Sequence, residues 1–89
     1  MQEVTLVIRN KVGLHARPAA LFVQTANRFK SKVLAIKDGR EANAKSILSV
    51  LTLGAEQGAV VTVRAEGEDE VEAIQALKEL VENNFGEKE

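Results

Sequence analysis

Short segments with strand and helical periodicity alternate along this chain, and their order limits the possible folds. Strand patterns cover residues 3–8, 32–37 and 59–65, and a turn signal places a further strand at 40–43. Helical spacing covers residues 16–29, residues 46–53, and the segment between the acidic residues 68–70 and Gly86. The order βαββαβα, with short connections, favours an antiparallel sheet with helices on one face. The chain is therefore predicted to be an α+β open-faced β-sandwich, a single domain over residues 1–89.

Local signals mark the turns and caps between these segments. Asp38-Gly39 is typical of a tight hairpin between two strands. Ser46 is a preferred N-cap for the short helix, and Gly54 follows that helix directly. Val4, Leu6 and Ile8 are expected on the core face of the first strand.

Each of the two longer helices carries an apolar stripe. In the first helix the stripe is predicted to consist of Ala19, Phe22, Val23, Ala26 and Phe29. In the last helix it is predicted to consist of Val71, Ile74, Leu77, Leu80 and Val81.

Composition excludes several classes of protein. The 89 residues include three phenylalanines, no tyrosine or tryptophan, and no cysteine. An aliphatic core is expected, and the aromatic platforms on which nucleic-acid bases stack are lacking. No secretory leader and no apolar run of about 20 residues is visible, so neither export nor membrane insertion is expected. A cytoplasmic protein is the simplest prediction.

Charge is distributed unevenly along the chain. Residues 66–89 hold nine acidic residues and two lysines, a net charge of −7, which leaves +6 for residues 1–65. Complementary fields steer encounters between proteins, so an acidic partner is expected on the basic side. The alternative is that the last helix simply has a solvated acidic face.

The basic part of the chain contains its only histidine and its only proline, three residues apart. Pro18 is tolerated in the first turn of a helix, which puts His15 at or next to the N-cap. The backbone N–H groups of Ala16 and Arg17 and the positive end of the helix dipole favour an anion there.

These residues support two interpretations of His15. An imidazole titrates near pH ~6.5, so a ring nitrogen can act as a nucleophile at neutral pH, while the helix start and Arg17 hold a phosphoryl group. The alternative is a histidine that only caps the helix or lies on the surface. A metal site is not expected, because the chain has neither a second histidine nor a cysteine to complete the ligands.

Two separate motifs carry a resemblance to a known family. Gly13-Leu14-His15-Ala16-Arg17-Pro18-Ala19, together with Asn43-Ala44-Lys45-Ser46-Ile47, resembles the two signatures of HPr. HPr is the histidine-containing phosphocarrier of the bacterial phosphoenolpyruvate:sugar phosphotransferase system. The resemblance covers nearly the whole chain, including the spacing between the motifs.

The resemblance implies a fold, a function and a site. HPr accepts a phosphoryl group from phosphorylated enzyme I and passes it to the enzyme IIA domains of sugar permeases, without a cofactor and without being an enzyme itself. By that likeness the phosphoryl group sits on Nδ1 of His15, Arg17 neutralises it, and the helix start at Ala16, Arg17 and Pro18 receives its oxygens. The family's sheet has the strand order 1-4-2-3 and is backed by three helices.

The short helix is expected to present a surface to these partners. In HPr the positions of Ile47, Leu48 and Leu51 face partners beside the active histidine, and Lys45 is expected to contribute charge. The spacing of the three apolar residues also fits a role in the core. At least one of them is therefore expected to be buried, and Ile47 is the best candidate for exposure.

Ser46 has two interpretations. In many low-GC Gram-positive bacteria an HPr kinase/phosphorylase modifies the corresponding serine, and the product signals to a catabolite-control regulator. A phosphoserine at a helix N-terminus is locally favourable, and its charge would disturb docking by an acidic partner. The alternative is a purely structural N-cap.

Two further functions remain open. A nitrogen-branch phosphocarrier would use the same histidine chemistry and pass its phosphate to a regulator. A ligand- or nucleic-acid-binding module of the same architecture would carry no covalent phosphate, and the acidic last helix argues against nucleic acid. A carrier that alternates between partners is expected to be a monomer.

Overall fold

The computed structural model describes residues 1–86 of the chain. Residues 66–89, with their net charge of −7, are called the acidic segment below. Its last three residues, Glu87, Lys88 and Glu89, lie outside the described residues. The elements are β1 (Gln2–Val7), α1 (Ala16–Ala26), β2 (Lys32–Lys37), β3 (Arg40–Asn43), α2 (Ile47–Thr52), β4 (Val60–Glu66), α3 (Glu70–Glu82) and the 3-10 turn η1 (Asn84–Gly86).

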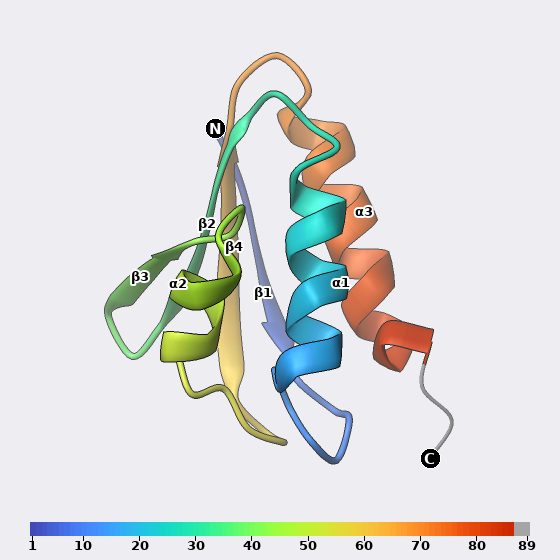
Figure 1. Cartoon of the computed structure of the whole chain (residues 1–89). Coiled ribbons are helices and arrows are strands. Elements are labelled where there is room, and N and C mark those ends of the chain that lie inside the picture. Colours follow the sequence, from blue (N-terminus) through green and yellow to red (C-terminus); the bar gives the residue numbers. More distant parts are fainter. Residues whose placement is uncertain (87–89) are drawn as a thin grey trace.

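The four strands form an antiparallel sheet in the order β1-β4-β2-β3. In Figure 1, α1 and α3 lie side by side across one face of the sheet, and α2 lies against α1 near β3. The predicted α+β open-faced sandwich and its strand order are therefore confirmed.

The core lies between the sheet and the two long helices. Small residues make up much of it: Ala19 and Ala73 from the helices, and Ala35 and Ala65 from the sheet, are all fully buried. Phe22 fills space between them and is only 1 % exposed. Alanine side chains let α3 lie close to β1 and β4, and let α1 and α3 pack against each other.

The hairpin between β2 and β3 forms where it was predicted. Asp38 and Gly39 have φ values of 52° and 77°, and Lys37 pairs with Arg40 across the turn. Two consecutive residues with positive φ are the signature of a type I′ turn, whose twist matches that of the strands.

Helix α1 is shorter than predicted, because it ends at Ala26 and not at residue 29. The Asn27 side chain donates both to the carbonyl oxygen of Val23 and to that of Lys45, at 3.0 and 3.1 Å. Asn27 thereby ties the end of α1 to the segment before α2. Phe29, predicted to lie on the helix's apolar stripe, lies beyond the helix and is half-buried.

Helix α3 departs from the prediction at the start of its stripe and at its C-terminal end. Val71, expected in the core, is 57 % exposed, and Ala73 is buried in its place. The helix ends at Glu82, before Gly86. Asn84 and Phe85 then adopt φ values of 52° and 56°, which turn the chain so that the Phe85 ring enters the core. Burial of this ring offsets the strain of a left-handed residue, about 1–2 kcal/mol.

The first and fourth strands are shifted by about one residue from their predicted ranges. Ile8 lies just beyond β1, yet it is only 1 % exposed and its N–H donates to the Ala59 carbonyl oxygen at 2.9 Å. The predicted core face of this strand is therefore retained for Leu6 and Ile8, while Val4 is partly buried.

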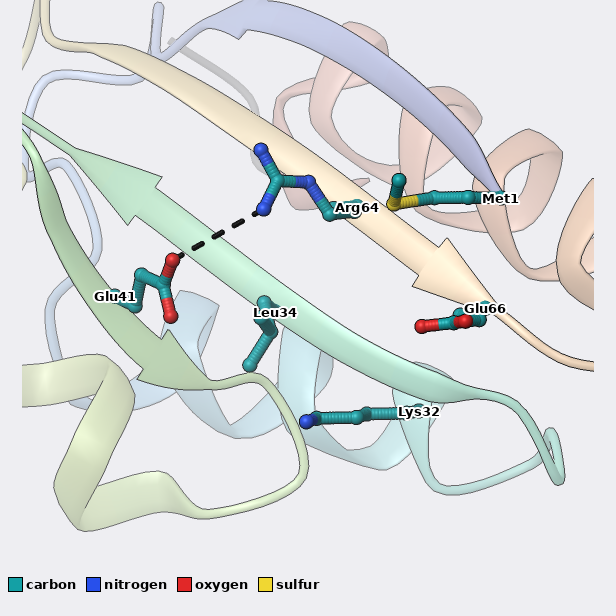
Figure 2. A pocket seen from close by; sticks show the side chains of 6 residues that line it. All are labelled: Met1, Lys32, Leu34, Glu41, Arg64 and Glu66. Carbon is teal, nitrogen blue, oxygen red and sulfur yellow. Dashed lines mark ion pairs between the residues drawn. The ribbon is translucent and has the colours of Figure 1, made fainter.

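Within residues 1–86, no helix covers the opposite face of the sheet, which carries charged side chains. Arg64 on β4 forms an ion pair with Glu3 at 2.8 Å and a longer one with Glu41 at 3.9 Å. Figure 2 shows Arg64 and Glu41 pointing toward each other above this face, near Leu34. Exposed ion pairs of this kind add little stability, and they keep the surface polar.

Asp69 joins the start of α3 to the turn that follows α1. Its carboxylate accepts hydrogen bonds from the backbone N–H groups of Lys30 and Ser31, at 2.8 and 2.9 Å, and from the Ser31 hydroxyl. The hydroxyl and the two N–H groups lower the pKa of Asp69 to about 2. The hydrogen bonds that join these two segments therefore depend on an ionised carboxylate at Asp69.

We predict that Asp69→Asn lowers the free energy of unfolding at neutral pH, because the amide has one acceptor oxygen and no charge. The carboxylate's contribution is present above its ordinary pKa of 3.8 and is lost as the pH falls toward about 2. Urea denaturation of both proteins over this range should therefore show a difference that shrinks in acid. Glu68→Gln, one residue earlier, is the control for loss of an exposed acidic charge; a difference between Asp69→Asn and the parent that does not change with pH would contradict the prediction.

Candidate functional site

His15 is the N-cap residue of α1, and its side chain makes no capping hydrogen bond. Its backbone is extended, with φ −82° and ψ −178°, and its carbonyl oxygen accepts from the Ala19 N–H at 2.8 Å. The side chain is exposed. The N–H groups of Ala16 and Arg17 have no acceptor within the helix, and the buried Pro18 has no N–H. The imidazole therefore lies in solvent beside two backbone donors and the positive end of a helix dipole.

The loop that contains Ala55 and Glu56 packs against the loop that carries His15. The Leu14 N–H donates to the carbonyl oxygen of Ala55 at 2.8 Å. Gly13 has φ 63°, and a Cβ atom there would lie 2.4 Å from that oxygen and 2.6 Å from the Cα atom of Glu56. Only glycine allows the two backbones to approach this closely. The position of His15 is thus set partly by residues forty positions later in the sequence.

Two further contacts hold the loops together. Gln57 Nε2 donates to the Arg9 carbonyl oxygen at 3.1 Å, and the Gly58 N–H donates to that of Ile8 at 2.7 Å. The Asn10 side chain is fully buried and donates to the Gly13 carbonyl oxygen at 2.9 Å. Sequence reasoning missed Ala55 and Gln57, because their role depends on contacts between distant segments, and it also missed Asn10, whose bond is local to the loop.

Three basic residues lie near His15 in the sequence. Arg17 is the second residue of α1, and Arg9 and Lys11 lie in the preceding loop; all three residues are exposed. The exposed side chain of Val12, 52 % accessible, lies in the same loop. This combination of basic and apolar side chains around an exposed histidine suits an anionic group and a transient partner. His15 and Arg17 both lie at the start of α1, and their joint role at one site stays a prediction.

Ser46 is the N-cap of α2, as predicted. Its Oγ accepts from the Ser49 N–H at 3.4 Å, and its carbonyl oxygen accepts from the Val50 N–H at 3.0 Å. The preceding Lys45 is half-buried, and its Nζ donates to the Phe29 carbonyl oxygen at 2.6 Å. Because Phe29 follows the end of α1, Ser46 lies at the opposite end of that helix from His15 (Figure 1).

Helix α2 presents three apolar side chains to solvent. Leu48 is 74 % exposed, and Ile47 and Leu51 are each 38 % exposed. The prediction that at least one of the three is buried is wrong, whereas Ile47, the best candidate for exposure, is indeed exposed. Val50 supplies the buried contact of this short helix and is fully inaccessible, which leaves the others free.

The far end of α2 lies close to the loop that supports His15. Arg40 Nη1 on β3 donates to the Thr52 carbonyl oxygen at 3.1 Å, and Gly54 follows with φ 61°. Ala55, whose oxygen binds the Leu14 N–H, comes next. Among the three exposed apolar residues of α2, Leu51 is therefore nearest in sequence to Ala55. Ser46, at the start of α2, is farther from Ala55 in the sequence.

Within residues 1–86, no cluster of three histidine, cysteine or acidic side chains is arranged to hold a metal ion. In the same part of the chain, no helix has the length and apolar character needed to cross a membrane.

Comparison with known proteins identifies the family. The family model described as "PTS HPr component phosphorylation site" matches residues 2–83. The chain belongs to the HPr family. It is therefore a phosphocarrier of the phosphotransferase system, and not a catalytic enzyme.

Relatives and solved structures agree with this family. Phosphocarrier protein HPr of Xylella fastidiosa (strain 9a5c) is 53% identical over 87 residues, which cover 98% of each chain. The crystal structure of HPr-C-His from Thermoanaerobacter tengcongensis has a TM-score of 0.97 and 57% identity, with both chains fully covered. A crystal structure described as an HPr dimer from the same organism has 59% identity and a TM-score of 0.79, covering 98% of this chain and 100% of that one. The expected monomer therefore stays a prediction.

We predict that Gly13→Ala destabilises the chain more than Gly39→Ala. Both glycines have positive φ, which costs about 1–2 kcal/mol for alanine. Only at Gly13 would the new Cβ meet backbone atoms, since nothing lies within 4 Å of it at Gly39. Urea denaturation should show the larger loss, and the His15 amide resonance should move in Gly13→Ala alone; equal losses of stability would contradict the close approach.

Proposed function

We propose that His15 accepts a phosphoryl group from phosphorylated enzyme I and passes it to enzyme IIA domains of sugar permeases. The exposed imidazole at the start of α1 carries this proposal. It makes no capping bond, and it lies beside two backbone donors and Arg17. The family membership of the chain supports the same role for this histidine.

The transfer exchanges one N–P bond for another. A ring nitrogen of His15, Nδ1 by likeness to the family, attacks the phosphorus of the donor's phosphohistidine, and the donor imidazole leaves with the electron pair of the broken bond. The transition state spreads negative charge over the phosphoryl oxygens, so positioning and positive charge provide most of the catalysis. Arg17 and the N–H groups at the helix start supply both, and Pro18 holds the first turn in place.

A shallow site suits this exchange, because each partner brings its own histidine to the same phosphorus. The exposed trio Ile47, Leu48 and Leu51 is proposed as the apolar part of the docking surface, and Leu48 offers the largest exposed area. Lys45 was expected to add charge to this surface; its ammonium group is engaged by the Phe29 carbonyl oxygen, so it contributes only if that bond opens. A cytoplasmic monomer that meets enzyme I and then an enzyme IIA domain is part of the proposal.

Ser46 is proposed as a regulatory phosphorylation site for an HPr kinase/phosphorylase, with the modified chain recognised by a catabolite-control regulator. Its Oγ is engaged only by a long 3.4 Å bond from the Ser49 N–H. A phosphate there gains the favourable end of the α2 dipole, so the helix is retained. The added charge lies next to Ile47 and opposes docking of an acidic partner.

The phosphoryl proposal is tested with phosphoenolpyruvate, Mg²⁺ and enzyme I. Intact mass spectrometry should show one added phosphoryl group that is lost in acid and absent from His15→Ala. No change of mass in the parent protein, or an unchanged gain in His15→Ala, would overturn the assignment.

Two variants in the same assay separate the role of Arg17 from general electrostatics. Arg17→Ala should lower the transfer rate by about tenfold or more while leaving the urea midpoint close to that of the parent, since an exposed charge adds little stability. Lys32→Ala removes an equal charge from the sheet face and should transfer at nearly the parent rate. Equal rates for Arg17→Ala and the parent would remove Arg17 from the site.

The regulatory proposal has its own assay. Incubation with an HPr kinase/phosphorylase and ATP should add an acid-stable phosphate to the parent and to His15→Ala, and none to Ser46→Ala. Failure of the parent to accept this phosphate would leave Ser46 as a structural cap, without affecting the assignment of His15.

A further inference from the structure

A groove lies between the end of α1 and the first turns of α3, away from His15. It encloses about 420 Å³, and its apolar lining comes from Phe29, Val71 and Ala76. The hollow on the open sheet face, shown in Figure 2, is smaller at about 190 Å³ and is lined mainly by charged side chains. The groove is thus the more apolar of the two concave surfaces.

The apolar side chains in the groove are not fully buried in the core. The buried stripe of α3 consists of Ala73, Leu77 and Val81, and Val71 lies outside it with 57 % of its surface exposed. Phe29 follows the end of α1 and is only partly covered; the Arg28 guanidinium lies over its ring, 5.4 Å from the centroid. An exposed valine beside a half-covered phenylalanine stabilises the monomer little, because neither is fully withdrawn from water.

Two glutamates and one arginine, Arg28, line the groove, which leaves it a net negative charge. Glu72 and Glu79 both line it, and Gln75 Nε2 donates to Glu79 Oε1 at 3.0 Å. Both carboxylates belong to the acidic segment, and both are exposed. Because the two carboxylates outnumber the Arg28 guanidinium, the lining favours a ligand that has basic groups around an apolar side chain.

The groove and the histidine lie at opposite ends of the same helix. α1 has 11 residues, which corresponds to a length of about 16 Å. Figure 1 shows that the start of α3 lies beside the end of α1, while His15 precedes the other end. A partner segment in the groove therefore leaves the imidazole, Arg17 and the exposed trio on α2 uncovered.

We infer that this groove is a second docking site, for a protein segment that presents leucine-like side chains flanked by lysine or arginine. The apolar side chain occupies the space between Phe29 and Val71, and the basic groups meet Glu72 and Glu79. The groove favours a basic partner, whereas the basic surface near His15 favours an acidic one. The two surfaces therefore select different partners. The inference does not depend on phosphoryl transfer at His15.

The test uses two synthetic peptides of equal positive charge, one a helical leucine–lysine peptide and the other with every leucine replaced by serine. Titration of the full chain, followed by amide NMR shifts, should move the resonances of Phe29, Val71 and Ala76 with the leucine peptide. The serine peptide should bind about tenfold more weakly, and added salt should weaken both. Equal binding of the two peptides, no binding, or shifts centred on Leu48 would overturn the inference.

Variants localise the binding. Val71→Lys and Glu72→Lys each should weaken binding of the leucine peptide by about tenfold. Val60→Lys is the matched control, because Val60 is 55 % exposed and lies on β4, away from the groove. The same loss in all three variants would indicate attraction by net charge alone and would overturn the inference. Shifts in the groove that grow with protein concentration without peptide would show a second copy as its occupant, which would also overturn it.

Discussion

The contact between Gly13 and the Ala55–Glu56 backbone controls the geometry of the site. A side chain at Gly13 would collide with that backbone, so the loop before α1 and the loop before β4 meet at a distance that only glycine permits. The Leu14 N–H completes the contact by donating to the Ala55 oxygen. Since His15 follows directly, its exposed position at the helix start depends on this long-range contact as much as on α1 itself.

The two long helices divide the surface by charge. The start of α1 brings an imidazole and Arg17 to the basic end, while α3 supplies acidic side chains at the other end of α1. α2 lies against α1 on the side away from α3, with its cap at Ser46 near the end of α1 and its last turn near the Ala55 contact that supports His15. A small sheet with helices on one face can therefore offer distinct surfaces to different partners without a deep cleft.

Local patterns predicted the features that depend on neighbouring residues. The Asp38-Gly39 turn, the Ser46 cap and the place of Pro18 in the first turn of α1 all follow from short-range sterics and hydrogen bonds. Helix ends were predicted less well. α1 stops at Ala26, because Asn27 bonds to the Lys45 oxygen and Asp69 holds the N–H groups of Lys30 and Ser31. These partners lie far away in the sequence.

By itself, the sequence determined the element order, the two motifs that point to HPr, and the placing of His15 and Arg17 at one helix start. Periodicity, capping preference and spacing are local properties, so they can be seen without coordinates. Only the tertiary structure decided that Val50 is buried and all of Ile47, Leu48 and Leu51 are exposed, and that Val71 leaves the core to line a groove with Phe29. Burial depends on which face of an element meets another, and that is settled only when distant segments pack together.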